Sequence, residues 1–128
     1  MGARTAKPTA GELEILRVLW ERGPSTVREI HETLSKRRDV GYTTVLKLLQ
    51  IMTAKGTVRR NEEQRAHIYE ACQAEEKTKR ELAGDVLQRV FAGSASQLMM
   101  HALEGRRASR EELDELRRLL DEYERDLK

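Results

Sequence analysis

The residues best suited to chemistry lie between Gly41 and Lys55, a stretch that contains no acidic residue. At about 100° per residue, its apolar side chains fall on one face of a helix: Val45, Leu48, Leu49 and Met52. The opposite face carries Thr43, Lys47 and Gln50. A small, polar and cationic face can enter the major groove of DNA, where a lysine reaches guanine acceptors or a phosphate. The pattern therefore predicts a DNA-reading helix.

The first turn of this helix offers a second kind of contact. Backbone N–H groups and the helix dipole near Tyr42, Thr43 and Thr44 favour a phosphate. An alternative interpretation is that the two threonines only cap the helix. Capping does not account for the outward Lys47 at the centre of the helix.

Basic residues also flank the helix. Residues 36–67 contain eight Lys or Arg against three acids, a net charge of +5, whereas the whole chain carries +2. A polyanion is the simplest partner for such a window. The arginines expected to contact phosphates are Arg37, Arg38, Arg59, Arg60 and Arg65. The alternative for each of them is a solvated surface side chain, and the adjacent Glu62 and Glu63 argue against deep insertion of this part of the chain.

Other chemistry finds little support in the sequence. The three histidines are far apart, and no catalytic or phosphate-binding motif is present, so we expect no catalytic residue and no enzyme activity. Cys72 is the single cysteine, and with His67 it would make only half a metal site, so we expect no metal and no cofactor. No apolar run approaches the roughly 20 residues that span a bilayer. We therefore expect a cytoplasmic protein with no membrane insertion.

The elements that must position the basic face follow from capping and periodicity. Thr9 to Glu12 and Thr26 to Glu29 fit capping boxes that open two helices, the first of which ends at Gly23-Pro24. A third helix spans residues 42–55 and stops at Gly56. Residues 57–60 and 66–71 then alternate as strands around a polar turn, which predicts a β-hairpin. Three helices and a hairpin make a winged helix-turn-helix.

The remainder of the chain is predicted to be helical. One helix covers residues 75–91, with Leu82, Val86, Val90 and Phe91 facing inward, and ends at Ala92-Gly93. Capping boxes from Ser94 to Gln97 and from Ser109 to Glu112 open two more helices. The fold class is therefore mainly α with a small β-hairpin: a winged-helix DNA-binding domain, residues 1–72, followed by a three-helix dimerisation domain, residues 73–128.

A second copy of the chain is the expected partner of the last two helices. The shorter one is apolar nearly all round, and the longer one has an a/d-like apolar seam. About 55 residues are too few for a self-sufficient core. The predicted interface residues are Leu98, Met99, Met100, Leu103, Leu113, Leu116, Leu120 and Tyr123. Met99 and Met100 lining a ligand cleft is the alternative.

Three segments resemble one known family: GYTTVLKLLQIMTAKG at 41–56, ELEILRVLW at 12–20 and TVREI at 26–30. Together with the C-terminal helices, they are similar to the BlaI/MecI penicillinase repressors from about Thr9 to Leu120. The resemblance implies a homodimeric repressor on a palindromic double-stranded DNA operator, with Thr43, Thr44 and Lys47 facing bases or phosphates. It also implies derepression through cleavage by a membrane sensor-protease that responds to β-lactams.

Two departures from the family pattern leave the inducer open. Family members are cut at an Asn-Phe bond, whereas the aligned pair here is His101-Ala102. Related copper-responsive repressors carry a C-terminal Cys-x-Cys pair, which this chain lacks. A winged-helix regulator that senses a small molecule and a winged-helix adaptor between proteins are the alternative functions. The basic window argues against the adaptor.

Overall fold

The computed structural model describes residues 7–63 and 65–127. The chain forms two compact units, whose boundary in the sequence falls between Leu82 and Ala83. Each unit is therefore described by itself.

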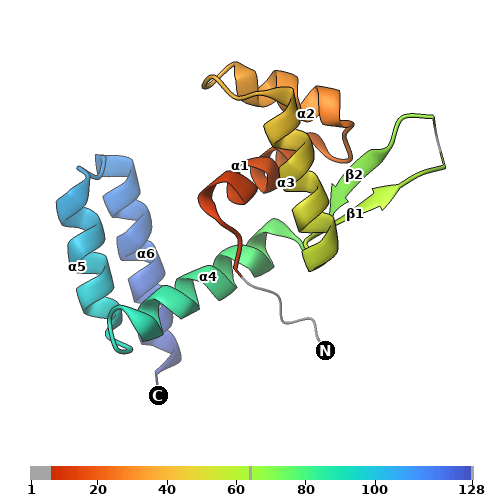
Figure 1. Ribbon diagram of the computed structural model, residues 1–128. Helices are drawn as coiled ribbons and strands as arrows, with labels where there is room; N and C mark the ends of the chain where they lie inside the picture. Colours follow the sequence, from red (N-terminus) through yellow and green to blue (C-terminus); the bar gives the residue numbers. More distant parts are fainter. Residues whose placement is uncertain (1–6, 64, 128) are drawn as a thin grey trace. The chain divides into compact units, whose positions relative to one another are not determined.

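The first unit is a winged helix (Figure 1). Its elements follow the predicted order: α1 (Ala10–Arg22), α2 (Val27–Ser35), α3 (Tyr42–Lys55), β1 (Val58–Asn61) and β2 (Ile68–Ala71). The two strands pair antiparallel, with Val58 opposite Ala71 and Asn61 opposite Ile68. The predicted bounds of α3 are confirmed, and each strand begins one or two residues later than predicted.

Local hydrogen bonds explain where the first two helices begin. The Thr9 hydroxyl accepts from the Glu12 N–H at 3.2 Å, and the Glu12 carboxylate accepts from the Thr9 N–H at 3.2 Å. Thr26 and Glu29 form the same reciprocal pair at 3.1 and 2.9 Å. Both predicted capping boxes are confirmed, and each satisfies two amides that a helix start leaves free.

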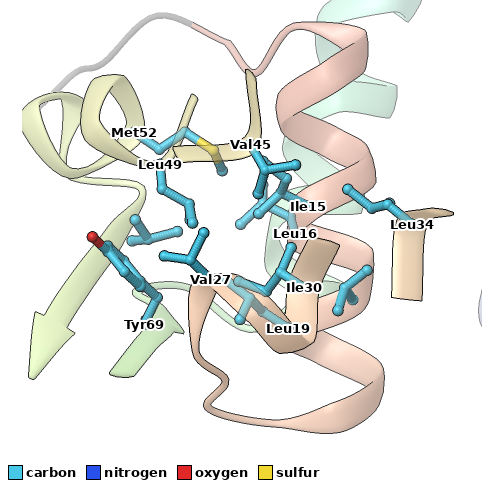
Figure 2. Close-up of a cluster of buried hydrophobic side chains, with 12 residues drawn as sticks. Ile15, Leu16, Leu19, Val27, Ile30, Leu34, Val45, Leu49, Met52 and Tyr69 are labelled. Carbon is cyan, nitrogen blue, oxygen red and sulfur yellow. The ribbon is translucent and has the colours of Figure 1, made fainter. Parts of the chain in front are cut away.

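The core of this unit lies between the three helices and the hairpin. Figure 2 shows side chains of α1, α2 and α3 converging with Tyr69 of β2. Its buried members are Ile15, Leu16, Val18, Leu19, Val27, Ile30, Leu34, Val45, Leu49, Met52, Val58 and Tyr69. The hairpin is joined to the helices by Ser25, whose backbone exchanges hydrogen bonds with Tyr69 at 2.9 and 2.8 Å. The apolar core contacts hold one face of α3 against α1 and α2.

Three helices follow the hairpin: α4 (Glu75–Arg89), α5 (Ala95–Gly105) and α6 (Arg110–Asp126). The predicted break after α4 is confirmed, because Ala92 and Gly93 have φ values of 49° and 87°. Positive φ suits glycine and is uncommon for alanine, so the helix cannot continue through this pair. Phe91 lies just outside α4, which ends two residues earlier than predicted.

The predicted capping boxes of α5 and α6 are only half formed. The Ser94 and Ser109 hydroxyls accept from the third helical N–H at 3.2 and 3.0 Å. The Glu112 carboxylate instead accepts from the Arg106 guanidinium at 2.7 Å. Among the described residues, no return bond from the Gln97 side chain to Ser94 is present. A nearby arginine is a stronger partner for a carboxylate than a neutral backbone amide.

Apolar side chains of the second unit remain open to solvent in the single chain. No described residue of α5 or α6 is buried. The inward positions predicted for Val86 and Val90 are wrong for the isolated chain, since these side chains are 39% and 68% exposed. Phe91 is half-buried, as is Leu82, the last residue of the first unit. The helical period identified an apolar face, but a single chain does not supply enough surface to cover it.

Candidate nucleic-acid interface

The outer face of α3 has the composition that the sequence predicted. Val45, Leu49 and Met52 are buried, and Leu48 is half-buried. The five side chains predicted to face DNA from this helix are all exposed: Tyr42, Thr43, Thr44, Lys47 and Gln50. One face therefore anchors the helix while the other presents hydroxyl, amide and ammonium groups.

Lys47 lies exposed at the centre of this face. Within the described part of the chain its ammonium group has no ion pair or hydrogen bond, and α3 itself contains no acid. A phosphate or base acceptor would therefore meet an unneutralised charge.

The C-terminal end of α3 is fixed to α1 by a partly buried ion pair. The Lys55 Nζ donates to both carboxylate oxygens of Glu12, at 2.9 and 3.0 Å. The Glu12 side chain is only 3% exposed, and it also accepts the Thr9 N–H. Gly56 then ends the helix with φ 87°, in the left-handed region that suits glycine.

The N-terminal end of α3 is held by His31, a residue whose role the sequence analysis did not predict. Its Nε2 lies 2.8 Å from the carbonyl oxygen of Val40 in the α2–α3 turn, and its ring lies edge-on to Tyr42 with centroids 5.7 Å apart. No local motif joins a mid-helix histidine to a carbonyl nine residues away. His31 thus positions the turn and the first residue of α3.

The two turn arginines already have carboxylate partners. Arg38 binds Glu14 through its Nε and Nη2 groups, with a shortest distance of 2.8 Å, and Arg37 lies 3.6 Å from Glu21. The hydrogen bond from Arg38 lowers the pKa of the Glu14 carboxyl. Both pairs join the α2–α3 turn to α1. A phosphate that binds either arginine would therefore have to share its N–H donors with the carboxylate partner.

The hairpin, or wing (residues 58–71), carries the other three predicted arginines. Arg59 Nε donates to Glu70 on the opposite strand at 2.9 Å, and this bond raises the pKa of Arg59. Arg60 is paired with Glu62, and its pKa is raised by hydrogen bonds to Tyr69 and Glu62. Arg65 is exposed and has no partner among the described residues. The wing thus contains both paired and unpaired cations.

The residues predicted for the dimer interface lie on α5 and α6. Leu98, Leu113 and Leu116 are half-buried within the single chain. The exposed members are Met99, Met100, Leu103, Leu120 and Tyr123. They leave apolar surface for a partner to cover.

The aligned cleavage pair also lies on α5. His101 and Ala102 are exposed inside the helix, with the His101 ring 5.7 Å from that of Phe91. In residues 7–63 and 65–127, no group of three or more His, Cys, Asp or Glu side chains is placed to hold a metal ion. The Cys72 thiol is free and exposed. None of the described helices has both the length and the apolar character required to cross a membrane.

Comparison of the chain with known proteins identifies one family. The penicillinase repressor family model matches residues 8–122. The transcriptional regulator BlaI of Mycobacterium tuberculosis is 39% identical over 118 residues, which cover 89% of this chain and 84% of that protein. The penicillinase repressor of Bacillus licheniformis is 26% identical, with 88% of each chain covered. The methicillin resistance regulatory protein MecI of Staphylococcus aureus is 22% identical, over 94% of this chain and 98% of that protein.

The family match includes α1 to α3, the wing and the C-terminal helices. The matched residues therefore include the winged helix and its exposed, acid-free α3 face. The chain therefore belongs to the penicillinase repressor, or BlaI/MecI, family of transcriptional repressors.

Proposed function

We propose that this repressor acts as a homodimer on a palindromic DNA operator, in the cytoplasm. Residues 1–72 would read the DNA, and residues 73–128 would form the dimer. The observation that carries the proposal is the exposed, acid-free face of α3, with Lys47 at its centre and without a partner among the described residues.

The chemistry of this face matches the major groove. Thr43 and Thr44 have short side chains that let the helix approach the bases, and their methyl groups can contact the thymine methyl group. Lys47 can donate to guanine acceptors or to a phosphate. Gln50 follows Lys47 by nearly one turn and offers both a donor and an acceptor. Tyr42, at the first turn, lies where backbone N–H groups favour a phosphate.

The arginines have a supporting role in this proposal. Contacts to phosphates set the orientation of the protein on DNA, but they carry no direct sequence information. Arg65 is free to make such a contact, while the other four must share donors with a carboxylate. Those four are Arg37, Arg38, Arg59 and Arg60.

Uncovered apolar surface supports the proposed dimer. Leu120 and Tyr123 on α6 are each 67% exposed, and Met100 on α5 is 50% exposed. Burying such side chains against a second copy removes apolar area from water at about 25 cal/mol per Å2. A two-fold interface presents two α3 helices symmetrically, so the operator should be palindromic.

We further propose that an inducing signal ends repression, as in the family. Proteolysis by a membrane sensor-protease is the family route, and the aligned position is His101-Ala102. The pair is exposed, but it lies within α5, so a protease would need local unwinding to reach an extended backbone.

A gel shift on the DNA upstream of this protein's own gene tests the function. The wild type should give a shift that resists unlabelled random DNA and weakens steeply with salt. Lys47→Ala should weaken operator binding by about 1–3 kcal/mol. Arg118→Ala is the charge-matched control, because it removes one exposed cation from α6 in the second unit.

The outcomes separate the proposed repressor from its rivals. An equal loss of operator affinity in Lys47→Ala and Arg118→Ala would show that only net charge matters. It would contradict the assignment of α3 as the DNA-reading helix. A wild-type shift abolished equally by random DNA would leave only non-specific cationic binding. That result would favour the adaptor function.

A further inference from the structure

We propose that Glu70 limits the sequence-independent DNA affinity of the wing by holding Arg59 as an intramolecular partner. This inference rests on the proposed function. It concerns a residue that weakens contact with DNA, in contrast to the residues of α3 that make it.

The pair is built into the hairpin. Arg59 on β1 lies directly opposite Glu70 on β2 in the strand register. The Arg59 Nε donates to the Glu70 Oε2 at 2.9 Å. The Arg59 side chain is 63% exposed, whereas the Glu70 side chain is 36% exposed. The carboxylate is thus the more enclosed member, and the guanidinium is the member that incoming DNA would meet.

A phosphate and the Glu70 carboxylate compete for the same donors. Guanidinium groups bind both anions through paired N–H groups in similar geometry. A phosphate must therefore displace the carboxylate from the Nε edge or accept a less favourable geometry at the remaining donors. A displaced carboxylate stays on the neighbouring strand and repels the phosphate. Either case reduces the contribution of Arg59 to binding.

The effect should be independent of base sequence, because phosphates are common to every duplex. It would lower affinity for random DNA together with affinity for the operator. The number of phosphates engaged sets the salt dependence, at about 0.9 in log–log slope for each contact. Releasing Arg59 in both protomers should therefore steepen the slope by up to about 1.8.

The same hairpin supplies a matched control. Glu63 is exposed, and its carboxylate has no partner among the described residues. Glu63→Gln and Glu70→Gln each remove one negative charge from the wing. Only the second substitution removes the ionic partner of an arginine, so a difference between them separates the pairing from net charge.

The experiment measures binding of the full-length chain to the operator duplex and to a random-sequence duplex over a salt series. Glu70→Gln should tighten binding to both duplexes by about threefold to tenfold at low salt and steepen the salt slope. Glu63→Gln should give a smaller gain. Adding Arg59→Ala to Glu70→Gln should remove the gain. Circular dichroism and sedimentation should show that each variant keeps the wild-type fold and oligomeric state.

Three results would overturn the proposal: no gain in Glu70→Gln, an equal gain in Glu63→Gln, or a gain that survives Arg59→Ala. Failure of the proposed function has a different signature. In that case the wild type would show no preference for the operator, while the random duplex would still decide the role of Glu70.

Discussion

Truncation of Leu120 tests the proposed dimer most directly. This α6 side chain is 67% exposed in the single chain. Burying a leucine side chain completely is worth about 1.5–3 kcal/mol, so covering two thirds of it contributes about 1–2 kcal/mol. A two-fold interface contains the residue twice, and Leu120→Ala should cost the dimer about 2–4 kcal/mol. The dissociation constant should then rise about 30- to 700-fold.

Sedimentation equilibrium over a range of protein concentrations measures this constant. Arg118→Ala is the control, because it lies about 200° around α6 from Leu120 and faces away from the apolar seam. Circular dichroism should show similar helix content for all three proteins at concentrations where they dimerise. Leu116→Asp should prevent dimerisation, since an unpaired buried charge costs several kcal/mol.

The reasoning would fail in two ways. A wild-type chain that stays monomeric at micromolar concentration would contradict the proposal of a dimer. A wild-type dimer that Leu120→Ala leaves unchanged would place the interface elsewhere on the chain.

Two further predictions concern the stability of the winged helix. Lys55→Met should lower the free energy of unfolding by about 3 kcal/mol, because it leaves the Glu12 carboxylate, which is 3% exposed, without its cation. Glu12→Gln should lower it less, because the Lys55 side chain is 24% exposed and its ammonium group can reach water. Urea unfolding at fixed protein concentration measures the free energy of unfolding of both variants. A loss in Glu12→Gln equal to or larger than the loss in Lys55→Met would contradict the prediction. Arg38 lowers the pKa of Glu14 below its ordinary 4.5, so this pair stabilises the fold above that pH and loses its contribution as the pH falls through the lowered value. Unfolding between pH 6 and pH 3 should therefore show a smaller acid-dependent loss in Glu14→Gln than in the wild type; identical profiles would refute the linkage.

Helix boundaries were predictable because their signals are local. A capping box depends on residues three positions apart, and the Thr9 and Thr26 boxes form as predicted. The bounds of α3 follow from its apolar period and from Gly56, which adopts positive φ at the helix end. The exposed face of α3 follows from the same period, so the principal candidate site could be derived from the sequence.

Charged partners were not predictable in the same way. Arg38 meets Glu14 across 24 positions, and Lys55 meets Glu12 across 43. His31 contacts the turn through a carbonyl that no motif identifies. At the start of α6, the capping-box pattern predicted a bond from the Ser109 backbone N–H to the Glu112 carboxylate. In the fold, this carboxylate accepts from Arg106 instead.

The sequence by itself determined which segments are helical, which face of α3 is cationic and which faces are apolar. These properties depend on residue types and on spacings within one or two turns. Only the tertiary structure decided which cations are free, because ion pairing depends on where separate elements meet. It left Lys47 and Arg65 without partners in the described chain and paired Arg59 with Glu70. It also showed that Val86 and Val90 are uncovered, since burial requires a neighbouring surface that periodicity alone does not specify.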